Sequence, residues 1–214
     1  MARIKERPKF IYQAPTLEYL YCLQNMSRWS EILLSQNNSK NYNEFLKWIL
    51  EQEYFENNNN ISIKKISEAS GYTSVKISKW LREIYNGILD LNESDPALFS
   101  HEKGIEAELR FRYFDNSCSF QTSLPVLPRV YETFDFFFIK AKLGWDSFWV
   151  KEVRHILEEN KSSICIFLEG GILNQSREFA LSKALFEERI SYFDLYQKVD
   201  LQIDDILLDR KRYT

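Results

Sequence analysis

The sequence has little of the residues that interrupt a fold or cross-link it. Its 214 residues include six glycines, five prolines, three cysteines and two histidines. So little glycine and proline, beside 44 % hydrophobic residues, excludes collagen-like and wholly disordered chains. Cys22, Cys118 and Cys165 form no CxxC pair, which excludes a disulfide framework and a zinc knuckle, and we expect buried thiols. His101 and His155 match neither HxxxH nor HExxH spacing, which excludes a histidine-based metal site.

Long apolar runs are also missing. Runs such as Phe136 to Ile139 fall far short of the roughly 18 apolar residues that cross a bilayer. The charged start MARIKERPKF is followed by no apolar segment and no small-residue cleavage site, so we expect no signal peptide. A cytoplasmic protein without a membrane span, a metal or a cofactor is therefore expected.

Aromatic residues are abundant, with 16 Phe, 12 Tyr and 5 Trp, and they favour a well-filled core. The net charge is only −3 and is unevenly distributed. Residues 1–92 hold 12 Lys and Arg against 10 Asp and Glu, whereas residues 93–214 hold 16 against 21. The balance of the amino-terminal part is therefore compatible with a nucleic-acid partner.

Hydrophobic periodicity predicts an α+β fold in two domains, a helical one over residues 1–92 and a β-rich one over residues 93–214. In the first domain, apolar residues three and four positions apart predict a helix from Thr16, as its cap, to about Ser35, and another from Asn43 to about Tyr54. The second domain is expected to form a small barrel or a curved antiparallel sheet, closed by a helix.

Alternation of apolar and polar residues indicates strands in the second domain, most clearly from Ile105 to Tyr113. Residues 147–157 fit either a helix or a strand. We favour a strand, because residues 159–161 resemble a hairpin turn into the next apolar run. Ser176 is expected to cap a final helix that runs to about Ile190. The remaining strands are predicted at Phe120–Leu127, Phe134–Ile139 and Ile164–Leu168.

The most informative stretch runs from Ile61 to Tyr85. Ser62 can cap a short helix, and Gly71 can supply the positive φ that ends it. Thr73 can then cap a second helix that reaches about Tyr85. Two helices joined by so tight a turn are the arrangement of a helix-turn-helix.

The residue identities around that turn carry a resemblance to a known family. Ile66, Ile77 and Leu81 are placed to form the core between the two helices, and the small Ser67 lies where they cross. The run GYTSVKISKWL, residues 71–81, resembles the Gly-x-Ser-x-x-x-Val-Ser-Arg-x-Leu pattern of bacterial repressor helix-turn-helix segments. The resemblance covers about 25 residues, and it departs from the pattern at Ser70 and Trp80.

In that family the second helix lies in the major groove of DNA, with its first turns facing base edges. Lysine can donate to guanine, serine can bond several bases, and a valine methyl can pack on a thymine methyl. The resemblance implies double-stranded DNA as partner and a homodimer, since one such motif reads only a few base pairs. By position it places Ser74, Val75, Ser78 and Lys79 against bases, and Lys64, Lys65, Thr73, Lys76 and Arg82 against phosphates.

The same residues allow other interpretations. The helix pair could be a scaffold in a structural or assembly protein, for example of a phage or mobile element, whose modules dock on protein partners. The β-rich residues 100–170 could bind a partner or a small ligand. The basic residues Arg3 to Lys9 could enter a minor groove or only keep the terminus soluble.

Catalysis is not indicated. His155 is accompanied by no serine or cysteine in a nucleophile motif. Glu106 and Glu108 alternate with apolar residues and share a strand face with two arginines, which is typical of a solvated face. We therefore expect a DNA-binding regulator rather than an enzyme. A two-metal nuclease site would need carboxylates on neighbouring strands. The carboxylates on or next to predicted strands are Glu106, Glu108, Asp115, Asp135 and Glu169.

Overall fold

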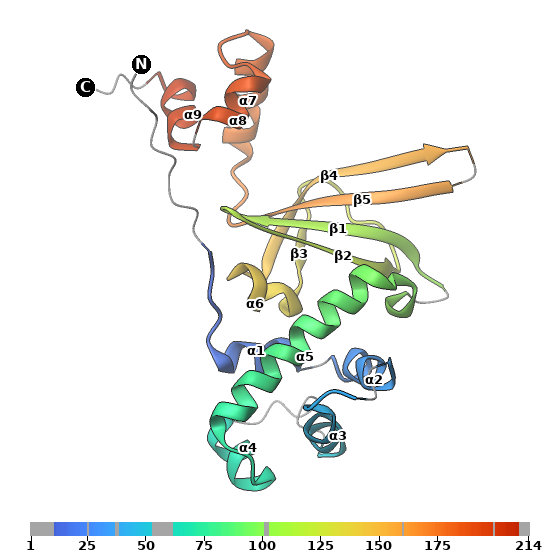
Figure 1. The fold of residues 1–214 in the computed structure, drawn as a ribbon. Helices are drawn as coiled ribbons and strands as arrows, with labels where there is room; N and C mark the ends of the chain where they lie inside the picture. The colour runs from blue at the N-terminus through green and yellow to red at the C-terminus, as the bar shows by residue number, and fades with distance from the viewer. Residues whose placement is uncertain are drawn as a thin grey trace. The chain divides into compact units, whose positions relative to one another are not determined.

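The computed structural model describes residues 11–24, 26–36, 39–52, 62–100, 103–159, 161–198 and 200–209. It shows an α+β protein in which helices precede a sheet and further helices follow it (Figure 1). The chain divides into two compact units between Gly171 and Ile172. The boundary predicted at residues 92/93 falls inside one long helix of the first unit.

In the described part of the first unit, helices come first along the chain. The longest, α5, has 21 residues and extends nine residues beyond the end predicted at Tyr85. α3 ends at Glu51, before the predicted end at Tyr54. The helices are α1 (Thr16–Leu23), α2 (Ser27–Gln36), α3 (Asn43–Glu51), α4 (Ile63–Ser70) and α5 (Ser74–Ser94).

The prediction of one helix from Thr16 to Ser35 is wrong, because the chain breaks between α1 and α2. Gln24 has an extended ψ of 140°, and its N–H donates to two carbonyls one turn earlier, which ends α1. Apolar spacing continues across the break because both helices bury one face, and neither glycine nor proline marks it. The cap is also displaced: Pro15 occupies it, and Thr16 is the first helical residue.

The sheet has five strands in the order β2-β1-β5-β4-β3 and curls into a half-barrel (Figure 1). It is mixed rather than antiparallel, because β1 and β5 pair in parallel. Parallel neighbours need a long connection, and the chain between β2 and β5 supplies it. The strands are β1 (Ile105–Tyr113), β2 (Asn116–Leu124), β3 (Thr133–Asp135), β4 (Ser147–Glu158) and β5 (Lys161–Gly170).

Two uncertain stretches are resolved by the structure. Residues 147–157 are a strand, as favoured, and β4 pairs with β5 up to Glu158 opposite Lys161. The strand predicted over Phe134–Ile139 is half wrong: after β3, residues Phe137–Ile139 form the 3₁₀ turn η2, followed by α6 (Lys140–Leu143). Phe138 and Ile139 are adjacent and both buried. A strand would place neighbouring side chains on opposite faces, whereas a helical turn can bury both.

One aromatic cluster joins the helices to the sheet. The Trp29 ring of α2 lies 4.8 Å from the Phe120 ring of β2 and 5.2 Å from the Phe138 ring, between ring centroids. Phe99, in the 3₁₀ turn η1 (Pro96–Phe99), and Phe136 also contact Trp29. Offset and edge-to-face aromatic pairs stabilise a core beyond their buried area. Helices and sheet therefore share one core, which explains why they form a single unit.

The cysteines are free thiols, and Cys22 and Cys165 are buried as expected, whereas Cys118 is half-buried. Cys22 Sγ accepts from the Ala141 N–H and donates to the Phe137 carbonyl, both at 3.3 Å. Burial raises the pKa of Cys22 to about 12 and that of Cys118 to about 11. Cys22 therefore ties α1 to η2 and α6 as an inert thiol.

The second unit contains α7 (Gln175–Phe186), α8 (Tyr192–Gln197) and α9 (Asp200–Leu207). Ala184, Ile190 and Ile203 form its small core. The helix predicted from Ser176 to Ile190 is instead capped by Asn174 and ends at Phe186, because Glu188 has a positive φ of 58°. In the described parts of both units, no helix combines the length and apolar character needed to cross a membrane.

Candidate nucleic-acid interface

Three local hydrogen bonds fix the starts of α4 and α5 and the turn between them. Ser62 Oγ accepts the Lys65 N–H at 3.3 Å, and Thr73 Oγ1 accepts the Lys76 N–H at 3.4 Å. Between them Gly71 takes a left-handed φ of 75°, and its N–H donates to the Ser67 carbonyl at 3.0 Å. A β-carbon at Gly71 would meet nothing within 4 Å, so glycine is needed there for its φ alone. The predicted caps and turn residue are therefore in place.

The packing between α4 and α5 follows the sequence prediction. Ile66, Ile77 and Leu81 are fully buried. Ser67 Oγ donates to the Tyr72 carbonyl at 2.6 Å, so a small residue there lets the turn fold against α4. Ser70, where the resembled family has an apolar residue, accepts the Tyr72 N–H at 3.4 Å instead.

Trp80, the second departure from the family pattern, lies in an aromatic cluster with α3. Its ring centroid is 4.9 Å from that of Tyr72 and 5.4 Å from that of Phe45. The Phe45 and Tyr72 rings complete the triangle at 6.1 Å. The large side chain therefore fixes α3 against the turn.

The candidate base-facing residues occupy the first two turns of α5. Ser74, Val75 and Lys79 are exposed, and Val75 keeps 80 % of its surface accessible. An apolar side chain so open, on a helix that buries six residues elsewhere, is free to contact another molecule. Ser78 is half-buried, and its hydroxyl donates to the Ser74 carbonyl at 2.7 Å, which leaves it mainly as an acceptor.

The candidate phosphate contacts are all exposed, and their own ion pairs are weak. Lys64 lies 3.9 Å from Glu68, and the base-facing candidate Lys79 lies 3.7 Å from Glu83, in solvent-exposed pairs one turn apart. Such pairs contribute little to stability, so both lysines are available to a stronger anion. The Arg82 guanidinium lies 5.7 Å from the Tyr19 ring centroid, which holds it near α1. The exposed candidates are Lys64, Lys65, Thr73, Lys76 and Arg82.

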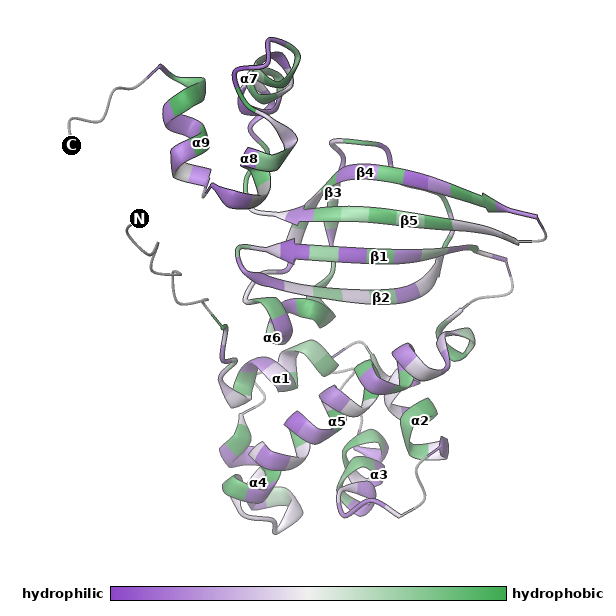
Figure 2. Cartoon of the chain, turned by 45° about the horizontal axis from the view of Figure 1, so that its top comes forward, coloured by the Kyte–Doolittle hydropathy of each residue, from purple (hydrophilic) through white to green (hydrophobic). Residues whose placement is uncertain are grey.

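The charges on α4 and α5 oppose the helix dipoles. Neither first turn holds an acidic residue, while Lys64, Lys65 and Lys76 lie there. The last turns of α5 hold Asp90 and Glu93 and no basic residue in the final turn. Figure 2 shows hydrophilic residues recurring along the whole of α5. Because a helix amino terminus favours anions, cations there are unfavourable alone and favourable beside a bound phosphate.

The far end of α5 contains a structural contact that sequence reasoning missed. Asn92 is buried, and its side-chain amide donates to the Gln121 carbonyl at 2.7 Å and accepts the Gln121 N–H at 2.9 Å. β2 is an edge strand, so this one side chain replaces a missing strand neighbour. Asn92 follows Tyr85 and Ile88 on the apolar face of α5, and a polar residue in that stripe was the available signal.

The candidate catalytic residues lie on or next to strands of the sheet, and not on α4 or α5. The outer face of β1 carries exposed ion pairs, Arg110 with Glu108 and Arg112 with Glu169, each at 2.9 Å. This is the solvated face predicted from the alternation. His155 is exposed on β4. Among the described residues, no three His, Cys, Asp or Glu side chains are grouped to hold a metal ion. The basic residues Arg3 to Lys9 lie outside the described residues.

Comparisons with protein-family models, with curated proteins and with solved structures find no match to this chain. The candidate site of the described residues is the exposed, cation-bearing start of α5, which the turn at Gly71 and the Trp80 cluster hold in place.

Proposed function

We propose that this chain is a DNA-binding protein that regulates transcription and places the first turns of α5 in the major groove. The observation that carries the proposal is the start of α5, where Val75 is 80 % exposed beside two short hydroxyl side chains and exposed cations. A methyl group, hydroxyls and cations in one helix turn match what base edges and phosphates offer. No catalytic role is included in the proposal.

Two further parts of the proposal follow from the mode of binding. A single helix reads only a few base pairs, so a homodimer on two half-sites gives the required selectivity. A protein that regulates transcription must be in the compartment that holds the DNA, so we propose the cytoplasm of a bacterial cell as its location. Assembly on a protein partner is the competing function, and it differs in its response to salt.

The test compares the wild type with the triple variant Lys76→Ala, Lys79→Ala, Arg82→Ala on mixed-sequence duplex DNA. Contacts to four or five phosphates should lower the affinity by roughly four powers of ten per tenfold rise in salt. Of the three cations, Lys76 and Arg82 are the proposed phosphate contacts, so the triple variant should lower that logarithmic slope by roughly 1.8. Fluorescence anisotropy at several salt concentrations measures both slopes.

A matched control removes two lysines and one arginine from exposed positions elsewhere, Lys47→Ala, Lys151→Ala, Arg154→Ala. Its net charge equals that of the test variant, so it should keep the wild-type slope if the contacts are local. Equal loss in both variants would show that net charge alone governs binding. A wild type that binds no duplex at low salt, while folded, would leave the protein-assembly function.

A further inference from the structure

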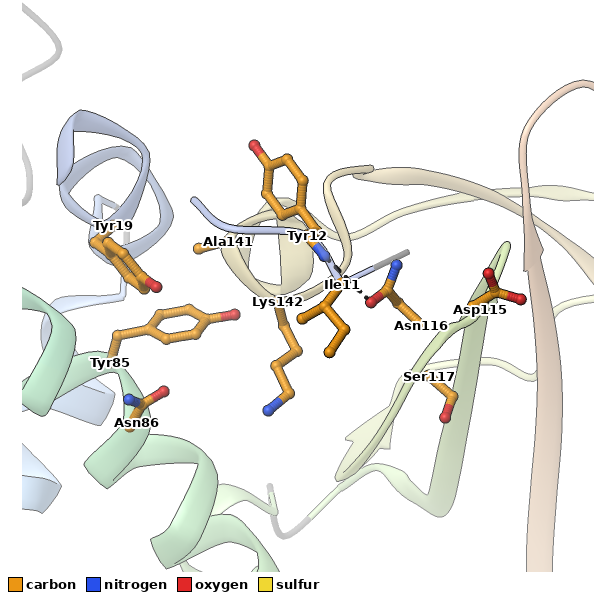
Figure 3. A pocket seen from close by; sticks show the side chains of 10 residues that line it. All are labelled: Ile11, Tyr12, Tyr19, Tyr85, Asn86, Asp115, Asn116, Ser117, Ala141 and Lys142. Atoms are coloured by element: carbon orange, nitrogen blue, oxygen red, sulfur yellow. Dashed lines mark hydrogen bonds between the residues drawn. The ribbon is translucent and has the colours of Figure 1, made fainter. Parts of the chain in front are cut away.

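A cavity of about 370 Å³ lies in the first unit, where α1, α5, the start of β2 and α6 meet. Figure 3 shows its walls, with Tyr19 from α1, Tyr85 and Asn86 from α5, Asn116 from β2 and Lys142 from α6. The volume falls within the range of sites that hold small molecules in proteins. None of the proposed DNA contacts lines this cavity.

Two polar groups of the wall have a donor without an acceptor. Tyr85 is 1 % exposed and its hydroxyl lies against the backbone N–H of Lys142, yet it donates to no acceptor among the described residues (Figure 3). Asn116 Nδ2 is buried without a partner in the same part of the chain, although Asn116 Oδ1 accepts the Tyr12 N–H at 3.4 Å. Leaving such a group unpaired costs about 1–3 kcal/mol, so both atoms favour a partner that the cavity can admit.

The composition of the wall defines the chemistry of that partner. One cation, Lys142, and one carboxylate, Asp115, line the cavity and balance each other. The other polar groups are phenols, amides and one serine hydroxyl, and the tyrosine rings add flat apolar surface. This wall suits a neutral molecule with several hydroxyl or amide groups, the size of a nucleoside or a monosaccharide.

The cavity is also connected to the proposed DNA-binding face. The Tyr19 ring packs edge-on against Tyr85, with centroids 5.3 Å apart, and its face carries the Arg82 guanidinium. Asn86 lies one helical turn after Arg82 on α5. A molecule that displaces Tyr19 or Asn86 therefore also acts on Arg82, a candidate phosphate contact. Tyr19 contacts Arg82 directly, and Asn86 lies one turn from it on the same helix.

We propose that this cavity binds a neutral, hydroxyl- and amide-bearing small molecule of nucleoside or monosaccharide size, and that its occupation changes the affinity of α5 for DNA. The binding step stands independently of the proposed function, and only the effect on affinity rests on it. Tyr85 and Asn116 supply the hydrogen bonds, and Tyr19 transmits the change to Arg82.

The binding test uses the full chain without DNA. Saturation-transfer NMR screens four nucleosides (adenosine, guanosine, cytidine and uridine) and two sugars (glucose and N-acetylglucosamine), and calorimetry measures the affinity of any that bind. Tyr85→Phe removes this hydroxyl donor and should weaken binding about five- to tenfold, the worth of one hydrogen bond. Tyr42→Phe removes another buried phenol, outside this cavity, and should leave the affinity unchanged.

Binding by a nucleoside alone or a sugar alone identifies the source of the ligand, and either result supports the site when Tyr85→Phe weakens it. If no compound binds at millimolar concentration, or if both tyrosine variants bind like the wild type, the site is overturned. DNA affinity is then measured with and without the compound that binds. Binding without any change in DNA affinity overturns the coupling alone, and failure of the wild type to bind DNA without the compound counts against the proposed function instead.

Discussion

The two ends of α5 are held in opposite ways. At its start, Ser74, Val75 and Lys79 are exposed, and one capping hydroxyl and the turn at Gly71 position them. At its end, Ile88 is fully buried and Asn92 forms two hydrogen bonds with the edge of the sheet. One helix thus combines a surface open to a partner with a stable attachment, so substitutions at its two ends should affect different properties.

The largest effect on stability is expected from Ile88→Ala, at the attached end. A fully buried isoleucine loses both its transfer free energy and its packing, so unfolding should become about 2–5 kcal/mol easier. Chemical denaturation followed by tryptophan fluorescence measures the loss. Ile88→Val, which removes a single methyl group, should cost about 0.5–1.5 kcal/mol. Equal losses in the two variants would contradict the tight packing assigned to this end.

Asn92→Leu should come next, with a loss of about 1–3 kcal/mol, because it leaves the Gln121 N–H and carbonyl without their partner. Amide hydrogen exchange should also become faster at Gln121. Asn86→Leu is the matched control, since Asn86 is exposed on the same helix, and its stability should stay near that of the wild type. Unchanged exchange at Gln121 in Asn92→Leu would show that the side chain does not replace a strand neighbour.

Gly71→Ala concerns the turn that positions the open end. An alanine there meets no atom within 4 Å, so its cost is the left-handed φ of 75° alone, roughly 1–2 kcal/mol. Gly71→Asn should lose less, because asparagine enters this region more readily. Thermal unfolding ranks the three proteins, and a fully stable alanine variant would mean that the turn adopts another conformation.

The smallest effect on stability is expected from Val75→Ala, at the open end, with a change below about 0.5 kcal/mol. On DNA, the same variant should lose roughly 1 kcal/mol of preference for a thymine methyl group. Binding to a selected site with each thymine replaced in turn by deoxyuridine measures this preference. A variant that still discriminates between the two bases would show that Val75 does not face them.

Local signals in the sequence predicted the turn and its surroundings well. Ser62, Gly71 and Thr73 each act on backbone groups within four residues, so their roles can be inferred without the rest of the fold. β1 likewise coincides with its predicted range, because alternation against a single core is a property of the strand itself.

Features assembled from distant segments could not be predicted in the same way. The break at Gln24 carries no glycine or proline, and the parallel pairing of β1 with β5 depends on residues far apart in the chain. The contact between Asn92 and Gln121 and the cavity beside Tyr85 both need the sheet to be placed against α5. Sequence periodicity reports that a face is buried, but it does not identify what covers that face.

The continuity of α5 has a mechanical consequence. Nineteen residues separate Thr73 from Asn92, which at 1.5 Å per residue is roughly 30 Å of rigid helix. A tilt of about 10° at the Asn92 attachment would displace the first turn by about 5 Å, close to the pitch of one helical turn. A small change of tilt at the edge of the sheet is therefore amplified along the helix into a displacement of its first turn relative to a bound partner.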